Sequence, residues 1–326
     1  MYTIALLAVQ NCMYSSITGP FDVFSVASFE EQRTTGRIGA PLFQPVIVTP
    51  ADRKITAFNG MPIRAGAFFT DPTVYDIVVV PVIFGDLEPI LADRETIGWL
   101  ARQGQHGACL CSVCAGAFFL AETGLLKGRK ATTHWNLADD FAKRFPDILL
   151  KREKMLIDEG DCITAGGACA YLDLSLYLIA RFGSPALAAS LSKILLIDPA
   201  RRLQSPYQTS NFNHNHGDMG ILSIQEWLEE NLDGPMTIRE LAQRARLGER
   251  TFMRRFKKAT GDTPMEYLQH LRIEAAKKLL ETSSETIDGI TRKSGYEDIS
   301  SFRKLFKRYT GLSPSAYRKK FSCLVC

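Results

Sequence analysis

Short apolar runs alternate with helical stretches through the first two thirds of the chain. Helical spacing of apolar residues predicts helices that include Asp93–Gln103 and Leu172–Phe182. Four other runs are short and dominated by apolar side chains, which predicts buried strands at Thr3–Val9, Pro45–Thr49, Asp76–Val82 and Ala108–Val113. Strands that alternate with helices in this way are typical of an α/β fold.

From Gly220 onward the pattern changes, because helix follows helix and no strand-like run occurs. Apolar residues recur at helical spacing from Ile221 to Leu228, and Asp233–Pro235 ends that first helix. Thr237, followed three residues later by Glu240, predicts a capping box at the start of the next helix. The second part is therefore expected to be all-helical.

The segment between these two parts is polar, rich in Asn, Ser and His, and lacks apolar periodicity. Such a segment is typical of a connection between domains. We therefore expect an N-terminal domain at residues 1–203, a linker at 204–219 and a C-terminal domain at 220–322.

One segment of the C-terminal part occurs twice, at an offset of 50 residues: TFMRRFKKATGDTPMEY begins at Thr251, and SFRKLFKRYTGLSPSAY begins at Ser301. Phenylalanines four residues apart mark the inward face of a helix in each copy. A glycine after that helix, Gly261 in the first copy, suits a left-handed C-terminal cap. The repeat indicates one supersecondary unit used twice. The identical pairs are Phe252/Phe302, Phe256/Phe306, Lys257/Lys307, Thr260/Thr310, Gly261/Gly311, Pro264/Pro314 and Tyr267/Tyr317.

Each copy completes a helix-turn-helix pattern. A short helix at Ile238–Ala245 and a turn at Leu247–Gly248 precede the first basic helix. Ile287–Lys293 and a turn at Gly295–Tyr296 precede the second, Ile299–Tyr309. One basic helix alone indicates only a solvated face, whereas two matched helices in this frame favour binding in the major groove of DNA.

These residues resemble the DNA-binding domain of the AraC/XylS family over Gly220–Phe321. That family has two helix-turn-helix units bridged by a long helix, here about Pro264–Leu280. The resemblance implies that the two recognition helices enter successive major grooves. It implies base contacts from Arg250, Met253, Arg254, Ser300, Arg303 and Lys304, and phosphate contacts from Thr251 and Lys257.

Candidate chemistry in the N-terminal part centres on Cys114, between a predicted strand and a helix that begins near Gly116. Small residues after the cysteine allow a sharp, strained turn. A helix N-terminus would lower the pKa of its thiol. Cys109 and Cys111 share one face of the strand, and we interpret them as small buried hydrophobes.

This part resembles the ThiJ/PfpI-like class I amidotransferase superfamily, in particular the GlxA-type regulators that fuse such a domain to an AraC-type module. The resemblance covers nearly all of residues 1–200 and implies a flavodoxin-like sandwich around a mostly parallel sheet. The matching segments are Thr18–Pro20 with Asp22 and Val23, the Cys114 elbow, Gly124–Leu126, Ala131–Trp135, and Thr164–Gly167 leading to Asp173.

The catalytic machinery departs from that superfamily in three places. Hydrolytic relatives place a histidine directly after the cysteine, where this chain has Ala115. Other enzymes carry an acidic residue where this chain has Ser16. Ile83 and Phe84 replace two glycines of an oxyanion loop. We therefore expect no enzyme, even though His134 remains a candidate base.

The vestigial site is instead expected to bind a small metabolite at the C-terminal ends of the strands. The expected lining is Gly19, Pro20, Ile83, Phe84, Cys114, Ala115 and His134. The expected function is a sequence-specific transcription regulator, an activator by family habit, and by analogy the effector is nitrogen-containing. Its expected partners are double-stranded promoter DNA, a second copy of the chain and, for an activator, RNA polymerase. A cysteine-dependent enzyme, a redox sensor at Cys114 and a purely dimerising scaffold stay open as alternatives.

Charge supports the division into two parts. The net charge of +4 is uneven, because residues 220–326 carry 20 Lys and Arg against 14 Asp and Glu, while residues 1–219 carry 19 against 21. A basic part joined to a mildly acidic part is typical of a nucleic-acid module attached to another domain.

Composition excludes several other classes. With 46% hydrophobic and 23% charged residues, the 326-residue chain is ordinary globular protein. Its longest apolar stretch, Ile77–Phe84, is too short to span a membrane. No basic residue precedes the apolar N-terminal run, so we expect no secretory signal and a cytoplasmic protein. Neither Cys323 with Cys326 nor His214 with His216 has the partners of a metal site, so no metal and no cofactor are expected.

Overall fold

The computed structural model describes residues 1–50, 54–199, 201–210 and 212–322. The chain divides into two compact units, residues 1–204 and 205–326. The Cys323 and Cys326 pair lies outside the described residues. Among the residues that are described, none of the helices combines the length and apolar character of a membrane span.

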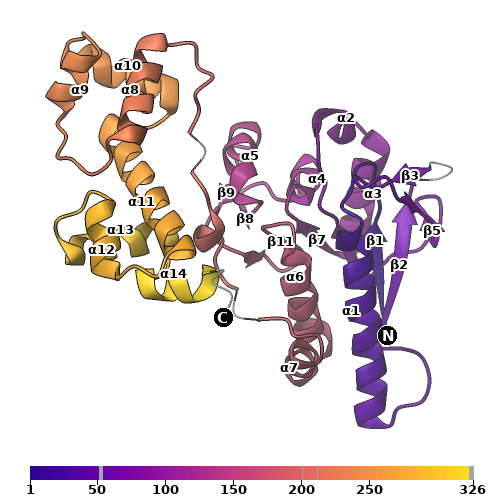
Figure 1. Ribbon diagram of the computed structural model, residues 1–326. Coiled ribbons are helices and arrows are strands. Elements are labelled where there is room, and N and C mark those ends of the chain that lie inside the picture. Colours follow the sequence, from indigo (N-terminus) through magenta and orange to yellow (C-terminus); the bar gives the residue numbers. More distant parts are fainter. Residues whose placement is uncertain (51–53, 200, 211, 323–326) are drawn as a thin grey trace. The chain divides into compact units, whose positions relative to one another are not determined.

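A seven-stranded sheet forms the centre of the first unit (Figure 1). All neighbouring strands are parallel except the antiparallel pair β10 and β11 at one edge. In spatial order the strands are β10 (Leu156–Asp158), β11 (Cys162–Ala165), β7 (Cys109–Val113), β6 (Ile77–Val80), β1 (Tyr2–Leu7), β2 (Phe43–Thr49) and β5 (Ala67–Phe68). Every residue of β6, β7 and β11 is buried, as expected for strands covered on both faces.

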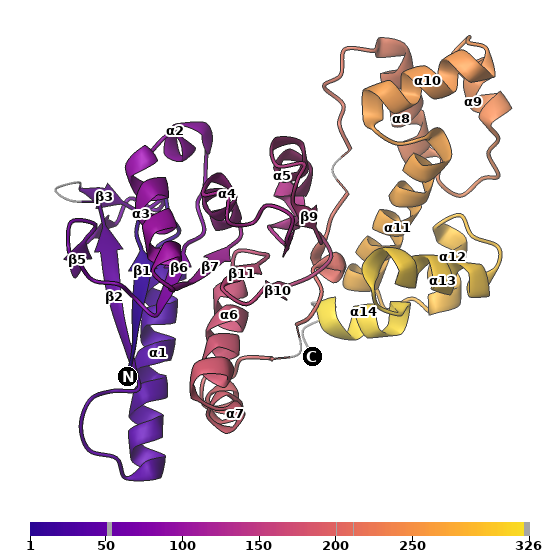
Figure 2. The same ribbon diagram turned by 180° about the vertical axis from the view of Figure 1, so that it is seen from behind.

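Helices cover both faces of this sheet (Figures 1 and 2). One face carries α1 (Ser15–Thr35), α6 (Ala170–Leu178) and α7 (Pro185–Ile194), and the other carries α2 (Glu88–Leu91), α3 (Arg94–Gln105) and α4 (Gly116–Glu122). Two further pairs of short strands, β3 (Ile55–Thr56) with β4 (Pro62–Ile63) and β8 (Lys130–Ala131) with β9 (Leu149–Leu150), and helix α5 (Ala138–Arg144) lie outside the main sheet. The predicted flavodoxin-like α/β sandwich is confirmed.

The four predicted strands are present as β1, β2, β6 and β7, with slightly different ends. The predicted helix at 93–103 is α3, and the one at 172–182 is α6, which continues as a π-helical turn at Ile179–Gly183. The sequence did not predict α1, because Gly19 and Pro20 interrupt it and read as helix breakers. Gly19 has a packing role there, because a Cβ at this position would lie 2.5 Å from Cε2 of Tyr171 on α6.

The second unit is entirely helical within its described residues. A short 3-10 helix at Ser205–Tyr207 comes first. The α-helices are α8 (Met219–Glu230), α9 (Ile238–Arg244), α10 (Glu249–Thr260), α11 (Pro264–Thr282), α12 (Ile287–Lys293), α13 (Ile299–Thr310) and α14 (Pro314–Phe321). The capping box predicted at Thr237 and Glu240 is confirmed, and a second one joins Thr263 to Glu266 at the start of α11. Gly261 is left-handed, at φ +88°, and caps α10 as predicted.

Two separate hydrophobic clusters form the core of the second unit. The first surrounds Phe252 and Phe256, and the second surrounds Phe302 and Phe306. The long helix α11 contributes to both, with Leu268 in the first cluster and Leu280 in the second. The repeat in the sequence therefore corresponds to two helix-turn-helix units that share one bridging helix, as predicted.

Candidate functional site

Cys114 occupies the sharp turn between β7 and α4. Its φ of +57° is left-handed, a conformation that strains a residue with a side chain. Its backbone N–H donates to the carbonyl of Ala165 at the end of β11, at 2.8 Å. Gly116 packs so closely on the loop after β6 that a Cβ there would lie 2.7 Å from the carbonyl oxygen of Pro81. The predicted strained elbow is confirmed.

The prediction of thiolate character at Cys114 is wrong. Burial raises the pKa of this thiol to about 12, although a hydrogen bond with the backbone of Ala115 acts in the opposite direction. Only 5% of the residue is exposed, and α4 has only seven residues. The loss of hydration outweighs the field of this short helix, so the thiol stays protonated near neutral pH.

Loops from three neighbouring parallel strands meet around this elbow. Cys12, after β1, forms an isolated bridge with Ile83, after β6. The backbone N–H of Val82 donates to Oγ of Ser16 at 3.2 Å, and that of Phe84 donates to the carbonyl of Asn11 at 3.1 Å. These two N–H groups have protein acceptors and are not free to stabilise an oxyanion, which agrees with the departure of this loop from the enzymes.

The predicted pocket residues differ in exposure. Ile83 and Ala115 are buried, as is Pro20 within α1, whereas 37% of Phe84 is exposed. Phe84 packs on Phe58, with ring centroids 4.8 Å apart. Phe58 was not predicted from the sequence, because the loop before β4 shows no motif that links it to the elbow.

His134 and its neighbour Thr133 lie on the loop after β8. Oγ1 of Thr133 donates to the carbonyl oxygen of Cys114 at 2.8 Å, so this loop contacts the elbow directly. Nδ1 of His134 accepts a hydrogen bond from the backbone N–H of Asn136 at 3.1 Å, and burial lowers the pKa of the imidazole. Within the described residues, no hydrogen bond joins His134 to the thiol of Cys114.

Gln204, predicted from the sequence as the first residue of the linker, is the last residue of the first compact unit. Its side chain is buried beside Thr132 and Thr133, and its Oε1 accepts from the backbone N–H of Trp135 at 3.1 Å. A glutamine in a polar segment carries no sequence signal of burial, so only the structure reveals this position.

The predicted DNA-contacting residues lie on α10 and α13 or at their starts. All are exposed, whereas the phenylalanines of the same helices are fully buried. They are Arg250, Thr251, Met253, Arg254 and Lys257 on α10, and Ser300, Arg303 and Lys304 on α13. Each helix therefore presents a polar and mainly basic outer face, which suits phosphates and base edges.

Neither histidine of the connecting segment belongs to a cluster of possible metal ligands among the described residues. Nε2 of His214 pairs with Glu229 at 2.9 Å, and Nε2 of His216 contacts Oε1 of Gln225 at 2.6 Å. Both histidines instead tie the segment to α8.

Comparison with known proteins identifies the first unit. Residues 5–181, more than half of the chain, match the model of the DJ-1/PfpI family. The chain belongs to the DJ-1/PfpI family. Residues 241–320 match a helix-turn-helix domain model, so this family member also carries an AraC-type DNA-binding domain.

Relatives of this family member have the same two-domain extent. It is 28% identical to the HTH-type transcriptional regulator CdhR of Pseudomonas aeruginosa, over 90% of this chain and 87% of the relative. It is 25% identical to the HTH-type transcriptional regulator GlxA of Rhizobium meliloti, over 92% and 93% of the two chains. The crystal structure of a ThiJ/PfpI family protein from Pseudomonas syringae aligns with a TM-score of 0.51 and 24% identity, over 75% of this chain and 88% of the other, which supports the fold. The protein is a transcription regulator with a helix-turn-helix DNA-binding domain.

Proposed function

We propose that this regulator is controlled by a small-molecule effector that binds beside Cys114, at the carboxyl edge of the sheet. The proposed lining is the set predicted from the sequence, Gly19, Pro20, Ile83, Phe84, Cys114, Ala115 and His134. The proposed domain limits are those predicted from the sequence, 1–203 for the sensor, 204–219 for the linker and 220–322 for the DNA-binding domain, with the side chain of Gln204 packed in the first unit.

The main support for binding rather than catalysis is the state of the elbow. The thiol of Cys114 is buried and its pKa is raised, and the backbone N–H groups of Val82 and Phe84 are already bonded within the protein. A cysteine nucleophile requires a thiolate and free donors for the developing oxyanion. The site retains the position of a ligand pocket in this class of fold, while its raised thiol pKa and these two bonded N–H groups disfavour that chemistry.

On the DNA side, we propose that α10 and α13 enter successive major grooves. Arg250, Met253, Arg254, Ser300, Arg303 and Lys304 would contact bases, while Thr251 and Lys257 would contact phosphate. The outward basic faces of the two helices and their shared bridge α11 support this arrangement. A dimer formed through the N-terminal domain, activation of transcription and contact with RNA polymerase complete the proposal.

The test is a thermal-shift screen of the reduced protein against amino acids, amines and small carboxylates, run in parallel on Cys114→Ser. A ligand that binds the native state raises the melting temperature by mass action. We expect a saturable shift in both proteins, and the same compound should change the affinity of the full chain for promoter DNA.

Three results would contradict the proposal in different ways. A compound that is consumed by the wild type but not by Cys114→Ser would indicate an enzyme. DNA affinity that responds to mild peroxide, reversibly with thiol and only when Cys114 is present, would indicate a redox sensor. Equal DNA affinity with and without every bound compound would exclude control by an effector in this set.

A further inference from the structure

Gln204, the last residue of the first unit, is buried and hydrogen-bonded within that unit; we call it the anchor. Gln204 is 1% exposed, and its Nε2 lies 2.9 Å from the carbonyl oxygen of Thr133 and 2.9 Å from that of Lys154. Its Oε1 accepts from the backbone N–H of Trp135. A Cβ at Gly166 would overlap this amide, so only glycine leaves room for it.

Thr133 connects Gln204 to the elbow at Cys114. Thr133 accepts from Gln204 through its carbonyl and donates through its Oγ1 to the carbonyl of Cys114, at 2.8 Å. The next residue, His134, belongs to the proposed lining of the pocket. A continuous hydrogen-bonded path therefore joins Cys114, Thr133 and Gln204, and the path ends where the chain leaves the first unit.

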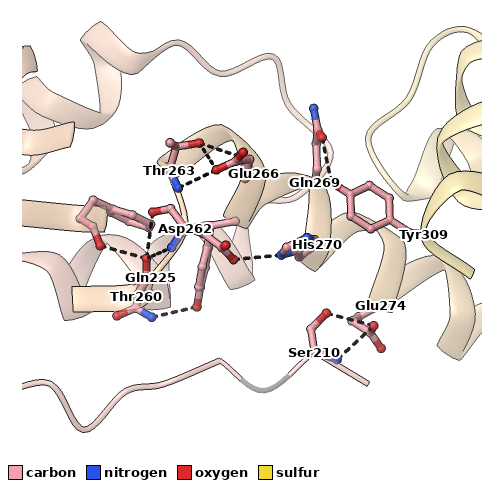
Figure 3. Close-up of polar contacts among 12 residues, drawn as sticks. Ser210, Gln225, Thr260, Asp262, Thr263, Glu266, Gln269, His270, Glu274 and Tyr309 are labelled. Carbon is pink, nitrogen blue, oxygen red and sulfur yellow. Dashed lines mark hydrogen bonds and ion pairs between the residues drawn. The ribbon is translucent and has the colours of Figure 1, made fainter. Parts of the chain in front are cut away.

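The residues that follow Gln204 are held by the second unit. We call the described residues 205–210 and 212–218 the strap. Nζ of Lys277 donates to the carbonyl of Gln208 at 2.7 Å, and both the backbone N–H and Oγ of Ser210 lie 3.2 Å from Glu274. Figure 3 shows Ser210 of the strap and Glu274 of α11 joined in this way.

The far end of the strap is tied to α8 through a buried amide. Gln225 is fully buried, and its Nε2 donates to the carbonyl of Asn213 at 3.1 Å and to the hydroxyl of Tyr267 at 2.9 Å. Near the start of the strap, the ring of Tyr207 packs against Phe321, with ring centroids 5.3 Å apart. The strap therefore contacts residues of both helix-turn-helix units.

Lys277 contributes a buried charged group to these contacts. Its side chain is only 7% exposed, and its ammonium group is paired with Glu274 at 2.7 Å. A buried ammonium without hydrogen bonds is unfavourable in free energy. The hydrogen bond from Lys277 to the carbonyl of Gln208 is therefore not readily broken.

We propose that Gln204 is a positioning residue that couples the pocket beside Cys114 to the DNA-binding unit through the strap. The inference rests on the proposed function, because it assumes that the pocket is where control begins. A ligand that shifts the loop at Thr133 and His134 moves the carbonyl to which the Gln204 amide donates, and so changes the position of that amide. Ser205 follows Gln204 directly, so a change in the position of the Gln204 amide also displaces the start of the strap. The rest of the strap is hydrogen-bonded to α8 and α11. Control requires that the two arrangements differ in DNA affinity, and the anchor supplies that difference.

By reciprocity, DNA binding must also alter the pocket end of the path, so coupling can be measured without an identified effector. The probe is iodoacetamide, with labelling of each cysteine followed by peptide mass spectrometry. The DNA is a duplex selected in vitro from a random-sequence pool with the wild-type protein. In the wild type we expect this duplex to change the labelling rate of Cys114 by about five-fold or more. Labelling of the buried Cys162 should change little, which excludes general unfolding.

The decisive variant is Gln204→Met, which keeps the length of the side chain and removes its hydrogen bonds. We expect its Cys114 labelling rate to be the same with and without the duplex, while its DNA affinity stays within about three-fold of the wild type. Gln208→Met is the matched control, because the strap contact of Gln208 is through its backbone carbonyl. It should retain the response to DNA.

Lys277→Met tests the other end and covers the case in which Gln204→Met fails to fold. It keeps the aliphatic stem but loses the tie to Gln208, so it should also lose the response of Cys114 to DNA. Lys278→Met, at the exposed neighbouring position of α11, should retain it.

A duplex that changes Cys114 labelling equally in the wild type, Gln204→Met and Lys277→Met would overturn the inference, and so would no change in the wild type. Either result leaves the proposed function to its own test. A compound could still shift the melting temperature and the DNA affinity by another route. Conversely, suppose that no compound changes DNA affinity while the labelling of Cys114 depends on DNA and on Gln204. That result would support the hydrogen-bonded path and contradict control by the proposed effector.

Discussion

At the scale of single residues, burial is the main cause of the raised pKa of three thiols in the first unit. It raises the pKa of Cys12 to about 11, and those of Cys114 and Cys162 to about 12. In the unfolded chain a thiol titrates near pH 8.5. The folded state therefore holds more protons than the unfolded state between these values.

A pH-dependent loss of stability follows from this difference. The stabilisation from a buried neutral thiol is fully present below about pH 8.5 and is lost as the pH rises toward 11 or 12. Each such thiol steepens the fall by up to about 1.4 kcal/mol per pH unit. We expect the melting temperature of the first unit to fall between pH 8 and pH 10, and less steeply in Cys114→Ala. Cys169→Ala, at an exposed position, should keep the wild-type slope, and identical slopes in all three proteins would contradict this prediction.

The same residues show what the sequence could predict about the site. The position of Cys114 at a strained elbow follows from local pattern, because a strand, small residues and a helix are adjacent in the sequence. The state of its thiol depends on which distant loops cover it, and local pattern does not contain that information. Gln204 escaped prediction for the same reason, since the carbonyls that bind its amide come from residues about 50 and 70 positions away.

At the scale of elements, α11 is the helix on which both DNA-binding units depend. Its start is fixed by Thr263, whose Oγ1 accepts from the backbone N–H of Glu266 at 3.4 Å while the Glu266 carboxylate accepts in return (Figure 3). Thr263→Ala removes the side-chain half of this box, and we expect it to lower the free energy of unfolding of the second unit by about 1 kcal/mol in urea titrations. Thr282→Ala, in the last turn of the same helix, is the control. Equal losses in the two variants would show that the box is not the cause.

The two core clusters predict that damage at one end of α11 stays local. Leu268 is buried in the first cluster and Leu280 in the second. Each Leu→Ala change should cost about 2–5 kcal/mol at its own site. By hydrogen exchange we expect Leu268→Ala to expose amides of α8 to α10, and Leu280→Ala to expose those of α12 to α14. If either variant accelerates exchange equally in both sets, the two units form a single cooperative core.

Elements differed in how well the sequence predicted them. Long amphipathic helices and fully apolar strands carry enough periodicity to be recognised. The repeat predicted the two helix-turn-helix units and the long helix that bridges them. The edge strands β5 and β10 have two and three residues, too few for any period to show. Helix α1 contains Gly19 for a packing reason that only the partner helix α6 explains.

At the scale of the whole molecule, the charge is concentrated where the proposed nucleic-acid contacts lie. Residues 220–326 carry six more basic than acidic residues, while residues 1–219 carry two fewer. The proposed contacts include five Arg and Lys side chains: Arg250, Arg254, Lys257, Arg303 and Lys304. Each phosphate neutralised releases condensed counterions, so affinity depends on salt through the number of such contacts.

The number of phosphate contacts can be measured from the salt dependence of DNA binding. If all five side chains neutralise phosphates, including the four proposed to contact bases, a plot of log affinity against log salt has its steepest slope, about −4.5, and affinity falls roughly 500-fold between 50 and 200 mM salt. With Lys257 alone on phosphate the slope is about −0.9. Base contacts from some of them make the slope shallower. Lys257→Ala, at a proposed phosphate contact, should reduce the slope by about 0.9 and weaken binding equally for all duplexes. Lys143→Ala on α5 of the first unit should leave the slope unchanged. A slope near zero in the wild type would mean that the basic faces of α10 and α13 are not the surface that meets DNA.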